Sequence, residues 1–310
     1  MNIAHYKLLE QIGAGGLGDV YRARDTKVGR TVALKVSEAQ EAAGDGARRA
    51  ALLARARDLL KLSHPSIATL FDAGEEGGRA YLAFEFVQGR PLRAVIGNHP
   101  LNPRRAVAFG IQLADALAGA HAEELVHGDI RPETIAVTNK ERAKLLDFGL
   151  SAFTRGGAAR TAGPAAASDE RRRAVAPYLA PEEAEGAGPS EASDIFALGC
   201  VLFEMLTGRQ AVGAGRGKPA PPPSTSAGSV PAELDAIFTR ATAVDPARRY
   251  LSAATLAAEL RGVGAILDVR AAEQEAMFDE GGAPSFLRRA LPWLLALAAL
   301  GAAAGGLWIW

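Results

Sequence analysis

The chain has 310 residues, of which 48% are hydrophobic, and its 35 basic and 35 acidic residues cancel to a formal net charge of zero. This length and composition suffice to bury a full core, which excludes a disordered tail, and the balanced charge gives no basic field for nucleic acid. The one cysteine, Cys200, excludes an internal disulfide and a typical zinc site. We therefore expect one large or two smaller folded domains in a reducing compartment.

The first part of the chain has the pattern of a small sheet. Residues 6–36 alternate apolar and polar positions around glycines, which is typical of antiparallel strands joined by tight turns. Apolar residues then recur at helical spacing over 47–62, and Ser63-His64-Pro65 ends this helix. Two more strands are predicted at 67–72 and 80–86.

The second part is larger and mainly helical. Gly89-Arg90-Pro91 indicates a boundary between the two parts. After it, helical periodicity predicts helices over the ranges 104–124, 193–206, 232–243 and 252–260.

The end of the chain has the pattern of a membrane span. Residues 290–310 carry no charge, and a helix of that length reaches roughly 31 Å, close to the hydrocarbon thickness of a bilayer. Arg288 and Arg289 precede it, so the positive-inside tendency predicts a single-pass protein of the inner (cytoplasmic) membrane with everything upstream in the cytoplasm. An Ala-rich buried helix is the alternative, which the basic and aromatic flanks disfavour. Gly301 and Gly305 permit close helix contact and a homodimer, although Ala/Gly bias explains them equally well.

Three short segments carry the chemistry: Gly13-Ala14-Gly15-Gly16-Leu17-Gly18, Val32-Ala33-Leu34-Lys35 and Asp147-Phe148-Gly149. The glycine pattern alone is weak, because the same letters serve dinucleotide-binding folds and ordinary turns. Here it lies between two strand-like runs and the lysine follows on the next strand. Glycines let a hairpin approach phosphates without a side-chain clash, and a lysine supplies a fixed positive charge to them.

On these segments, residues 6 to about 262 resemble a bacterial serine/threonine protein kinase domain of the eukaryotic-like (Hanks) type. The resemblance implies an α+β, bilobal protein-kinase-like fold that binds ATP and Mg²⁺. The implied parts are an N-lobe over 1–87, a C-lobe over 88–265, a juxtamembrane linker over 266–289 and the transmembrane helix over 290–310.

The resemblance also assigns roles to individual residues. The nucleotide would be held by the following residues: Gly13, Gly15, Gly18, Val20, Ala33 and Lys35, with hinge backbone groups from Glu85 and Val87 and with Phe84 as the gatekeeper. The structural positions of the family are matched by Glu182 paired with Arg249, by Asp194 at the start of the central buried helix, and by a hydrophobic spine of Leu59, Leu70, His127 and Phe148.

The segment from His127 to Thr134 matches the catalytic loop of the family. Asp129 would orient the substrate hydroxyl, and Asp147 would hold Mg²⁺. Arg131 stands where a lysine normally faces the γ-phosphate, and the two cations are not interchangeable. Thr134 stands where an asparagine normally holds a second Mg²⁺; its hydroxyl can ligate the ion, but the side chain is shorter.

Other departures from the family pattern bear on activity. Arg55 occupies the place of the acid that normally pairs with Lys35, and Asp58, one turn later, is a short substitute. Val175 replaces a threonine that normally bonds the catalytic aspartate, and Gly128 replaces the arginine of loop-phosphorylated kinases.

These departures lead to a hypothesis with an alternative. The sequence predicts a domain that binds Mg-ATP with phosphotransfer weak or lost, serving as a pseudokinase-type scaffold for a cytoplasmic protein partner. The alternative is an active serine/threonine kinase acting on cytoplasmic protein substrates.

Overall fold

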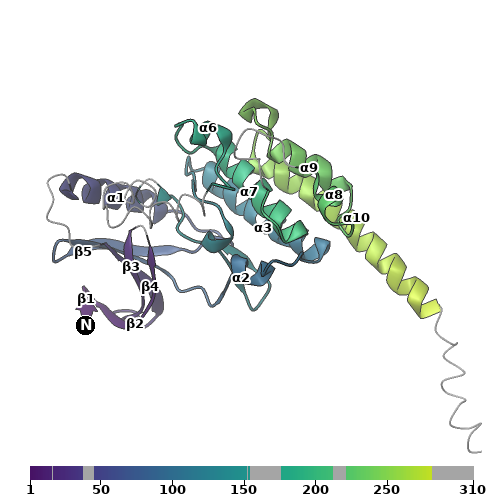
Figure 1. The fold of residues 1–310 in the computed structure, drawn as a ribbon. Coiled ribbons are helices and arrows are strands. Elements are labelled where there is room, and N and C mark those ends of the chain that lie inside the picture. The colour runs from purple at the N-terminus through teal and green to yellow at the C-terminus, as the bar shows by residue number, and fades with distance from the viewer. Residues whose placement is uncertain (16, 38–44, 152, 154–175, 212–220, 281–310) are drawn as a thin grey trace, which may run out of the picture. The chain divides into compact units, whose positions relative to one another are not determined.

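The computed structural model describes residues 1–15, 17–37, 45–151, 153, 176–211 and 221–280. Contacts divide the chain into a unit from Met1 to Val263 and a unit from Gly264 to Trp310. Within the first unit, the strands and helix α1 form one lobe, and helices α3, α7 and α9 belong to the other (Figure 1). The predicted bilobal kinase-like fold is confirmed.

An antiparallel sheet of six strands builds the first lobe, in the order β1-β2-β3-β4-β6-β5. Its strands are β1 (Asn2–Ile3), β2 (Tyr6–Gly15), β3 (Gly18–Asp25), β4 (Thr31–Ser37), β5 (Leu70–Glu76) and β6 (Arg79–Glu85). Helix α1 (Asp45–Leu59) packs against β5 and β6. The strands predicted over 6–36 and 80–86 are confirmed.

The prediction of a strand at 67–72 was wrong at its start. Strand β5 begins at Leu70, because the preceding residues are held by the second lobe. Ile67 forms a parallel bridge with Leu145, and the Ala68 amide donates to the Leu145 carbonyl at 2.8 Å. The connection between α1 and β5 is thereby tied to the strand that leads to Asp147.

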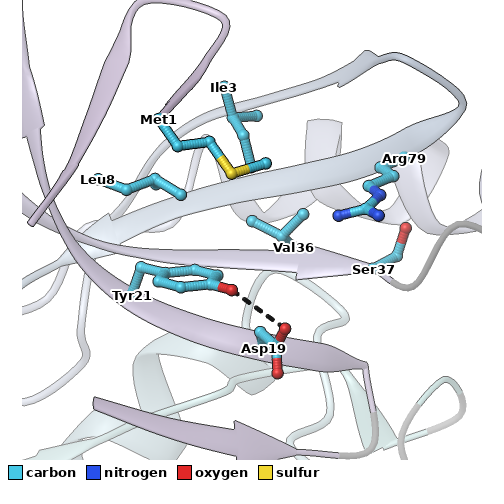
Figure 2. Close-up of a pocket in the computed structure, with 8 residues that line it drawn as sticks. All are labelled: Met1, Ile3, Leu8, Asp19, Tyr21, Val36, Ser37 and Arg79. Atoms are coloured by element: carbon cyan, nitrogen blue, oxygen red, sulfur yellow. Dashed lines mark hydrogen bonds between the residues drawn. The ribbon is translucent and has the colours of Figure 1, made fainter. Parts of the chain in front are cut away.

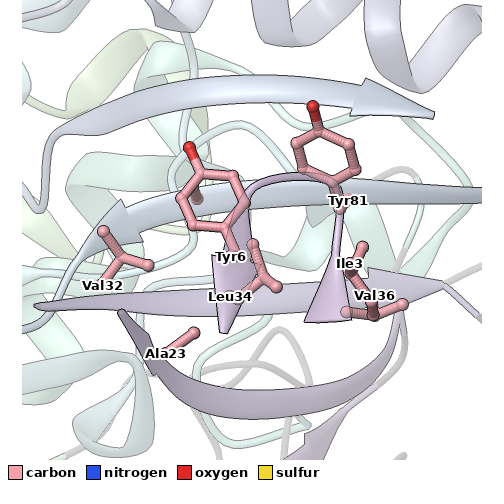
Figure 3. Packing of buried hydrophobic residues seen from close by; sticks show 8 residues of the cluster. Ile3, Tyr6, Ala23, Val32, Leu34, Val36 and Tyr81 are labelled. Atoms are coloured by element: carbon pink, nitrogen blue, oxygen red, sulfur yellow. The ribbon is translucent and has the colours of Figure 1, made fainter. Parts of the chain in front are cut away.

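Strict alternation along β4 separates a core face from a site face. Val32, Leu34 and Val36 are buried, while the positions between them are only partly covered. Figure 3 shows these three side chains beneath Tyr6 and Tyr81, whose rings meet edge-on at 5.8 Å. Since successive strand residues point to opposite faces, this packing fixes Ala33 and Lys35 on the other side of the sheet.

Helix α7 is the centre of the second lobe. It runs from Glu191 to Thr207, and every residue from Ser193 onward is buried. Ser190 caps its first turn, and it packs against α3 and α9, which explains why the sequence there is apolar all round. Cys200 lies within it as a buried thiol, as expected.

The other elements of the second lobe are mostly short. The helices are α2 (Leu92–Ile96), α3 (Pro103–His121), α6 (Pro181–Ala184), α8 (Pro223–Ser226) and α9 (Glu233–Ala241), with single-turn helices η1 (Pro132–Thr134) and η4 (Pro246–Arg248). A small sheet has the order β7 (Gly89–Pro91), β8 (Ile135–Thr138), β9 (Ala143–Leu145).

The last helix is much longer than predicted. Helix α10 runs from Ala253 to Glu280, whereas the periodicity predicted an end at Leu260. Beyond Gly264 the sequence is rich in Ala, Glu, Leu and Arg with no proline before Pro284, so nothing stops the helix. Among the described residues, no helix combines the length and the apolar character needed to cross a bilayer. The predicted span at 290–310 lies outside those residues.

Candidate active site

The glycine loop is the hairpin between β2 and β3. Gly13 pairs with Val20 and Gly15 pairs with Gly18 across it. Gly18 has a φ of +137°, and a β-carbon built there would lie 2.0 Å from the Val36 carbonyl oxygen. Only glycine fits this crossing, so the loop conformation depends on that residue.

Three neighbouring strands bring the predicted nucleotide residues together. Val20 on β3 is the register partner of Lys35 on β4, and Ala33 on β4 is the partner of Phe84 on β6. Lys35 is 14% exposed, and its Nζ lies 2.6 Å from Oδ1 of Asp147. The lysine of the first lobe therefore meets the aspartate of the second lobe directly.

The hinge positions follow the end of β6. Glu85 ends this strand, and its amide donates to the Thr69 carbonyl at 2.8 Å. The Glu85 carboxylate accepts from Lys144 Nζ at 2.8 Å, which ties the hinge to β9. Val87 lies between β6 and β7. Their backbone contacts with adenine stay a prediction.

The Asp147 segment is held in one conformation. Asp147 has a φ of +60°, an uncommon value for a residue with a side chain, and the Leu146 amide before it donates to the Thr134 carbonyl at 2.8 Å. Phe148 is 2% exposed and its ring meets that of His127 edge-on at 4.9 Å. The other two residues of the predicted spine, Leu59 and Leu70, are also buried. The aspartate is therefore turned toward the site while the phenylalanine stays in the core.

Asp194 on α7 fixes the catalytic loop from below. Its carboxylate is 1% exposed and accepts from the amides of His127 and Gly128, both at 2.8 Å. His121 Nε2 lies 3.0 Å from the same carboxylate. A buried carboxylate with several donors is strongly held in place, so the loop inherits the rigidity of α7.

Glycine at position 128 has a structural reason. Its φ is +75°, and a β-carbon there would lie 2.4 Å from the Ser151 hydroxyl oxygen and 3.0 Å from Pro189. Side chains rarely adopt this backbone conformation, and the space is occupied. The residue that replaces the family's arginine is thus matched to its neighbours.

Arg131 bridges two carboxylates of the same loop. Its Nε donates to Oδ1 of Asp129 at 3.2 Å and its Nη1 donates to Oε2 of Glu133 at 3.1 Å. The planar guanidinium makes both contacts at once, which a single ammonium group would not do with the same geometry. Asp129 and Arg131, predicted to act together, do lie together.

Thr134 uses its hydroxyl inside the loop. The oxygen lies 2.7 Å from the Asp129 carbonyl and 3.0 Å from the Arg131 carbonyl, as donor, and accepts from the Arg131 amide at 3.1 Å. A hydroxyl has two lone pairs, so one remains for a metal. Its predicted role as a ligand is untested, and its hydrogen bonds hold the loop.

Helix α1 gives Lys35 no acid among the described residues. Arg55 instead donates to the Val126 carbonyl at 3.5 Å, and its Nε lies 3.1 Å from the point where a β-carbon on Gly149 would stand. Asp58, the suggested substitute, is 53% exposed and lies 3.7 Å from Lys61. That substitution was wrong, because Asp58 points to solvent.

The described residues fit the needs of Mg²⁺ in part. They contain no group of three or more His, Cys, Asp or Glu side chains that could hold a metal. Mg²⁺ with a nucleotide needs only one or two carboxylates, because phosphates and water complete its shell. Asp147, 31% exposed, meets that need once Lys35 moves toward phosphate. Val175 lies outside the described residues.

The sequence patterns missed a network beside the catalytic loop. Arg93 on α2 donates from Nε to Oε1 of Glu133 at 2.7 Å, from Nη1 to Glu204, and from Nη2 to the Tyr178 hydroxyl at 2.6 Å. Burial alone raises the pKa of Glu133, but the hydrogen bond and charge of Arg93 outweigh it and lower this pKa. Glu204, an acid within an apolar helix, was the available signal, because a buried charge requires a partner.

A hollow on the first lobe lies away from this site. Figure 2 shows it, with a volume of about 330 Å³ and a Tyr21 hydroxyl that donates to Asp19 at 3.1 Å. Val36 lines it, and this residue is on the face of β4 opposite to Lys35. The hollow is therefore separate from the predicted nucleotide face.

Comparison with known proteins agrees with this geometry. Residues 6–220 match the model of the protein kinase domain. The serine/threonine-protein kinase PknD of Mycobacterium tuberculosis is 37% identical over 264 residues, and PrkC of Bacillus subtilis is 34% identical over 266. These matches cover 81% and 83% of this chain but only 38% and 40% of the two relatives, so they concern one part of each.

Solved structures show the same fold. The kinase domain of Mycobacterium tuberculosis PknI superposes with a TM-score of 0.67 at 26% identity, covering 84% of this chain and 97% of that domain. The likeness extends over both lobes.

Proposed function

This chain belongs to the protein kinase family and is similar to bacterial serine/threonine kinases, and from that premise we propose that it binds Mg-ATP and transfers phosphate weakly or not at all. The observation that carries the proposal is the Lys35 to Asp147 ion pair at 2.6 Å, with Arg55 where an acid would hold the lysine. Because Lys35 has no carboxylate on α1 among the described residues, its position depends on the same aspartate that would hold Mg²⁺.

Each residue would act on the nucleotide through charge and position. Mg²⁺ on Asp147 would neutralise phosphate charge, with the Thr134 hydroxyl as a weaker second ligand. Lys35 would bind the inner phosphates, and Arg131 would bind the outer one. Asp129 accepts from Arg131 at 3.2 Å and would orient the hydroxyl of a serine or threonine.

Two features support slow transfer. Nucleotide binding must separate Lys35 from Asp147, so part of the binding free energy is used to break an existing ion pair. The three hydrogen-bonded contacts of Thr134 within the loop compete with metal ligation. A domain of this kind would act as a scaffold whose closed form is favoured by ATP and read by a cytoplasmic protein.

An active serine/threonine kinase is the second candidate, favoured by a specific observation. The spine residues Leu59, Leu70, His127 and Phe148 are all buried, and Asp194 holds the catalytic loop. This assembled core would support transfer at a normal rate if the ion pair opens easily.

One experiment separates the two candidates. The purified chain with Mg-ATP is expected to gain thermal stability, and Lys35→Ala to lose that gain, with little labelled phosphate transferred to itself or to a basic protein. Transfer at rates typical of kinases, about 1 to 100 s⁻¹, that disappears in Asp129→Asn would refute the weak-transfer proposal. No stabilisation by any nucleotide would refute binding.

We also propose that residues 290–310 anchor the domain as a single span in the inner membrane, with the kinase domain in the cytoplasm. The support is the uncharged run itself and the arginines before it. The full chain is expected to stay in the membrane fraction after alkaline carbonate extraction, and a chain ending at Glu280 to be released. Release of both would contradict the anchor, and a homodimer through this span would then lose its basis.

A further inference from the structure

A line of alternating charges leads from the catalytic aspartate into the core of the second lobe. Asp129, Arg131, Glu133, Arg93 and Glu204 follow one another, each in contact with the next. Only the first three belong to the catalytic loop. The last two come from α2 and α7, so the loop is connected to parts of the fold that do not touch the nucleotide residues.

The inner end of this line is fixed. Glu204 is 3% exposed and accepts from both Arg93 and the Tyr178 hydroxyl, and Tyr178 is also buried. Leu92 and Ile96 bury the apolar face of α2 on either side of the arginine. Because Arg93 uses all three of its nitrogens on buried or half-buried partners, the direction of its guanidinium is set by the core.

Glu133 lies between two arginines and divides its oxygens between them. Oε1 accepts from Arg93 Nε at 2.7 Å, and Oε2 accepts from Arg131 Nη1 at 3.1 Å. Arg131 thus receives one oxygen rather than two. Among the residues that the structure describes, its Nη2 has no protein acceptor, so this nitrogen is available to a phosphate.

We propose that Arg93 is a positioning residue for Arg131, acting through Glu133, which rests on the proposed binding of Mg-ATP. By occupying one oxygen of Glu133, Arg93 prevents this carboxylate from closing on Arg131. Arginine and carboxylate prefer a bidentate fork with two parallel hydrogen bonds. Without Arg93, Glu133 would form that fork and draw Arg131 away from Asp129 and from the outermost phosphate.

The test compares ATP with ADP, because only ATP carries the phosphate that Arg131 would bind. Dissociation constants for both nucleotides with Mg²⁺ give a preference ratio that requires no phosphotransfer. Arg93→Met is expected to lower the preference for ATP by about fivefold or more, on the scale of one partly exposed ion pair. Adding Glu133→Gln to Arg93→Met is expected to restore the ratio, because the amide cannot form the fork.

Arg90→Met is the matched control. Arg90 is three residues away, exposed, and donates to the Ala94 carbonyl at 2.9 Å, so its loss removes the same charge without touching Glu133. An equal change in Arg90→Met, or an unchanged ratio in folded Arg93→Met, would overturn the proposal. So would failure of Glu133→Gln to restore it.

A second variant covers a failure to fold. Arg93→Met leaves the buried Glu204 without its cation, whereas Arg93→Lys keeps that charge but replaces the fork by one ammonium group. If only Arg93→Lys folds, at least a twofold loss of ATP preference is expected, and no loss would count against the role of Arg93. Absence of binding of either nucleotide to the unmodified chain would instead refute the proposed function itself.

Discussion

The double variant Arg55→Glu with Thr134→Asn is expected to transfer phosphate to serine or threonine on the order of 10²-fold faster than the unmodified chain, the scale of one preorganised electrostatic contact. Glutamate at position 55 would give Lys35 a partner on α1, so that Asp147 is released for Mg²⁺. Asparagine at position 134 would offer a longer metal ligand in place of a hydroxyl that now bonds the loop. Initial rates of labelled phosphate transfer at saturating Mg-ATP measure the effect.

Arg57→Glu with Thr134→Asn is the control for this variant. Arg57 lies on the same helix but is exposed, so the change of charge is identical while the direction is not. Equal acceleration by the two variants would attribute the effect to charge or to Thr134 alone. No acceleration by Arg55→Glu with Thr134→Asn would mean that the missing acid does not limit transfer. The contact of Arg55 with the Gly149 segment would then be the more important one.

Replacing Arg249 by alanine is expected to lower the free energy of unfolding by about 3–5 kcal/mol, because one partner of a buried ion pair is lost. The Arg249 side chain is fully buried and donates to both carboxylate oxygens of Glu182 at 2.7 Å. It also donates to the carbonyls of Ala192 and Ala243, at 2.9 and 2.8 Å. Alanine would leave a carboxylate and two carbonyls without this donor.

Urea unfolding of the chain measures this loss, with Arg248→Ala as the control. Arg248 is the adjacent residue and is exposed, so its removal should change the unfolding free energy by less than about 0.5 kcal/mol. Similar values for the two variants would show that the pair contributes little beyond surface charge. The same ion pair ties the segment containing Glu182 to the second lobe, so a large loss should also widen the range of conformations near Tyr178.

The sequence was sufficient for the residues whose chemistry is carried by type and order. Glycines between two strands, a lysine on the next strand, and Asp147 before Phe148 and Gly149 predicted the fold and the nucleotide face, because strand alternation alone puts Lys35 opposite the core. The apolar run around Cys200 predicted a central helix for a similar reason. Such local patterns depend on the period of the backbone and do not need a partner to be known.

The sequence failed where an outcome depends on a partner far along the chain. It offered Asp58 as a substitute for the missing acid, but helix α1 turns that side chain to solvent beside Lys61. It placed the start of β5 too early, because the bridge of Ile67 to Leu145 brings in a distant strand. It gave no account of Arg93, whose partners come from three other segments.

By itself, the sequence determined the family, the two lobes and the set of charged groups available for phosphate and metal. Only the tertiary structure decided how those groups pair: Lys35 with Asp147, Arg131 with Asp129 and Glu133, and Arg93 with Glu204. The physical reason is that a local pattern sets the face on which a side chain emerges. The choice among several opposite charges within reach depends instead on distances and burial that arise only when the elements have packed.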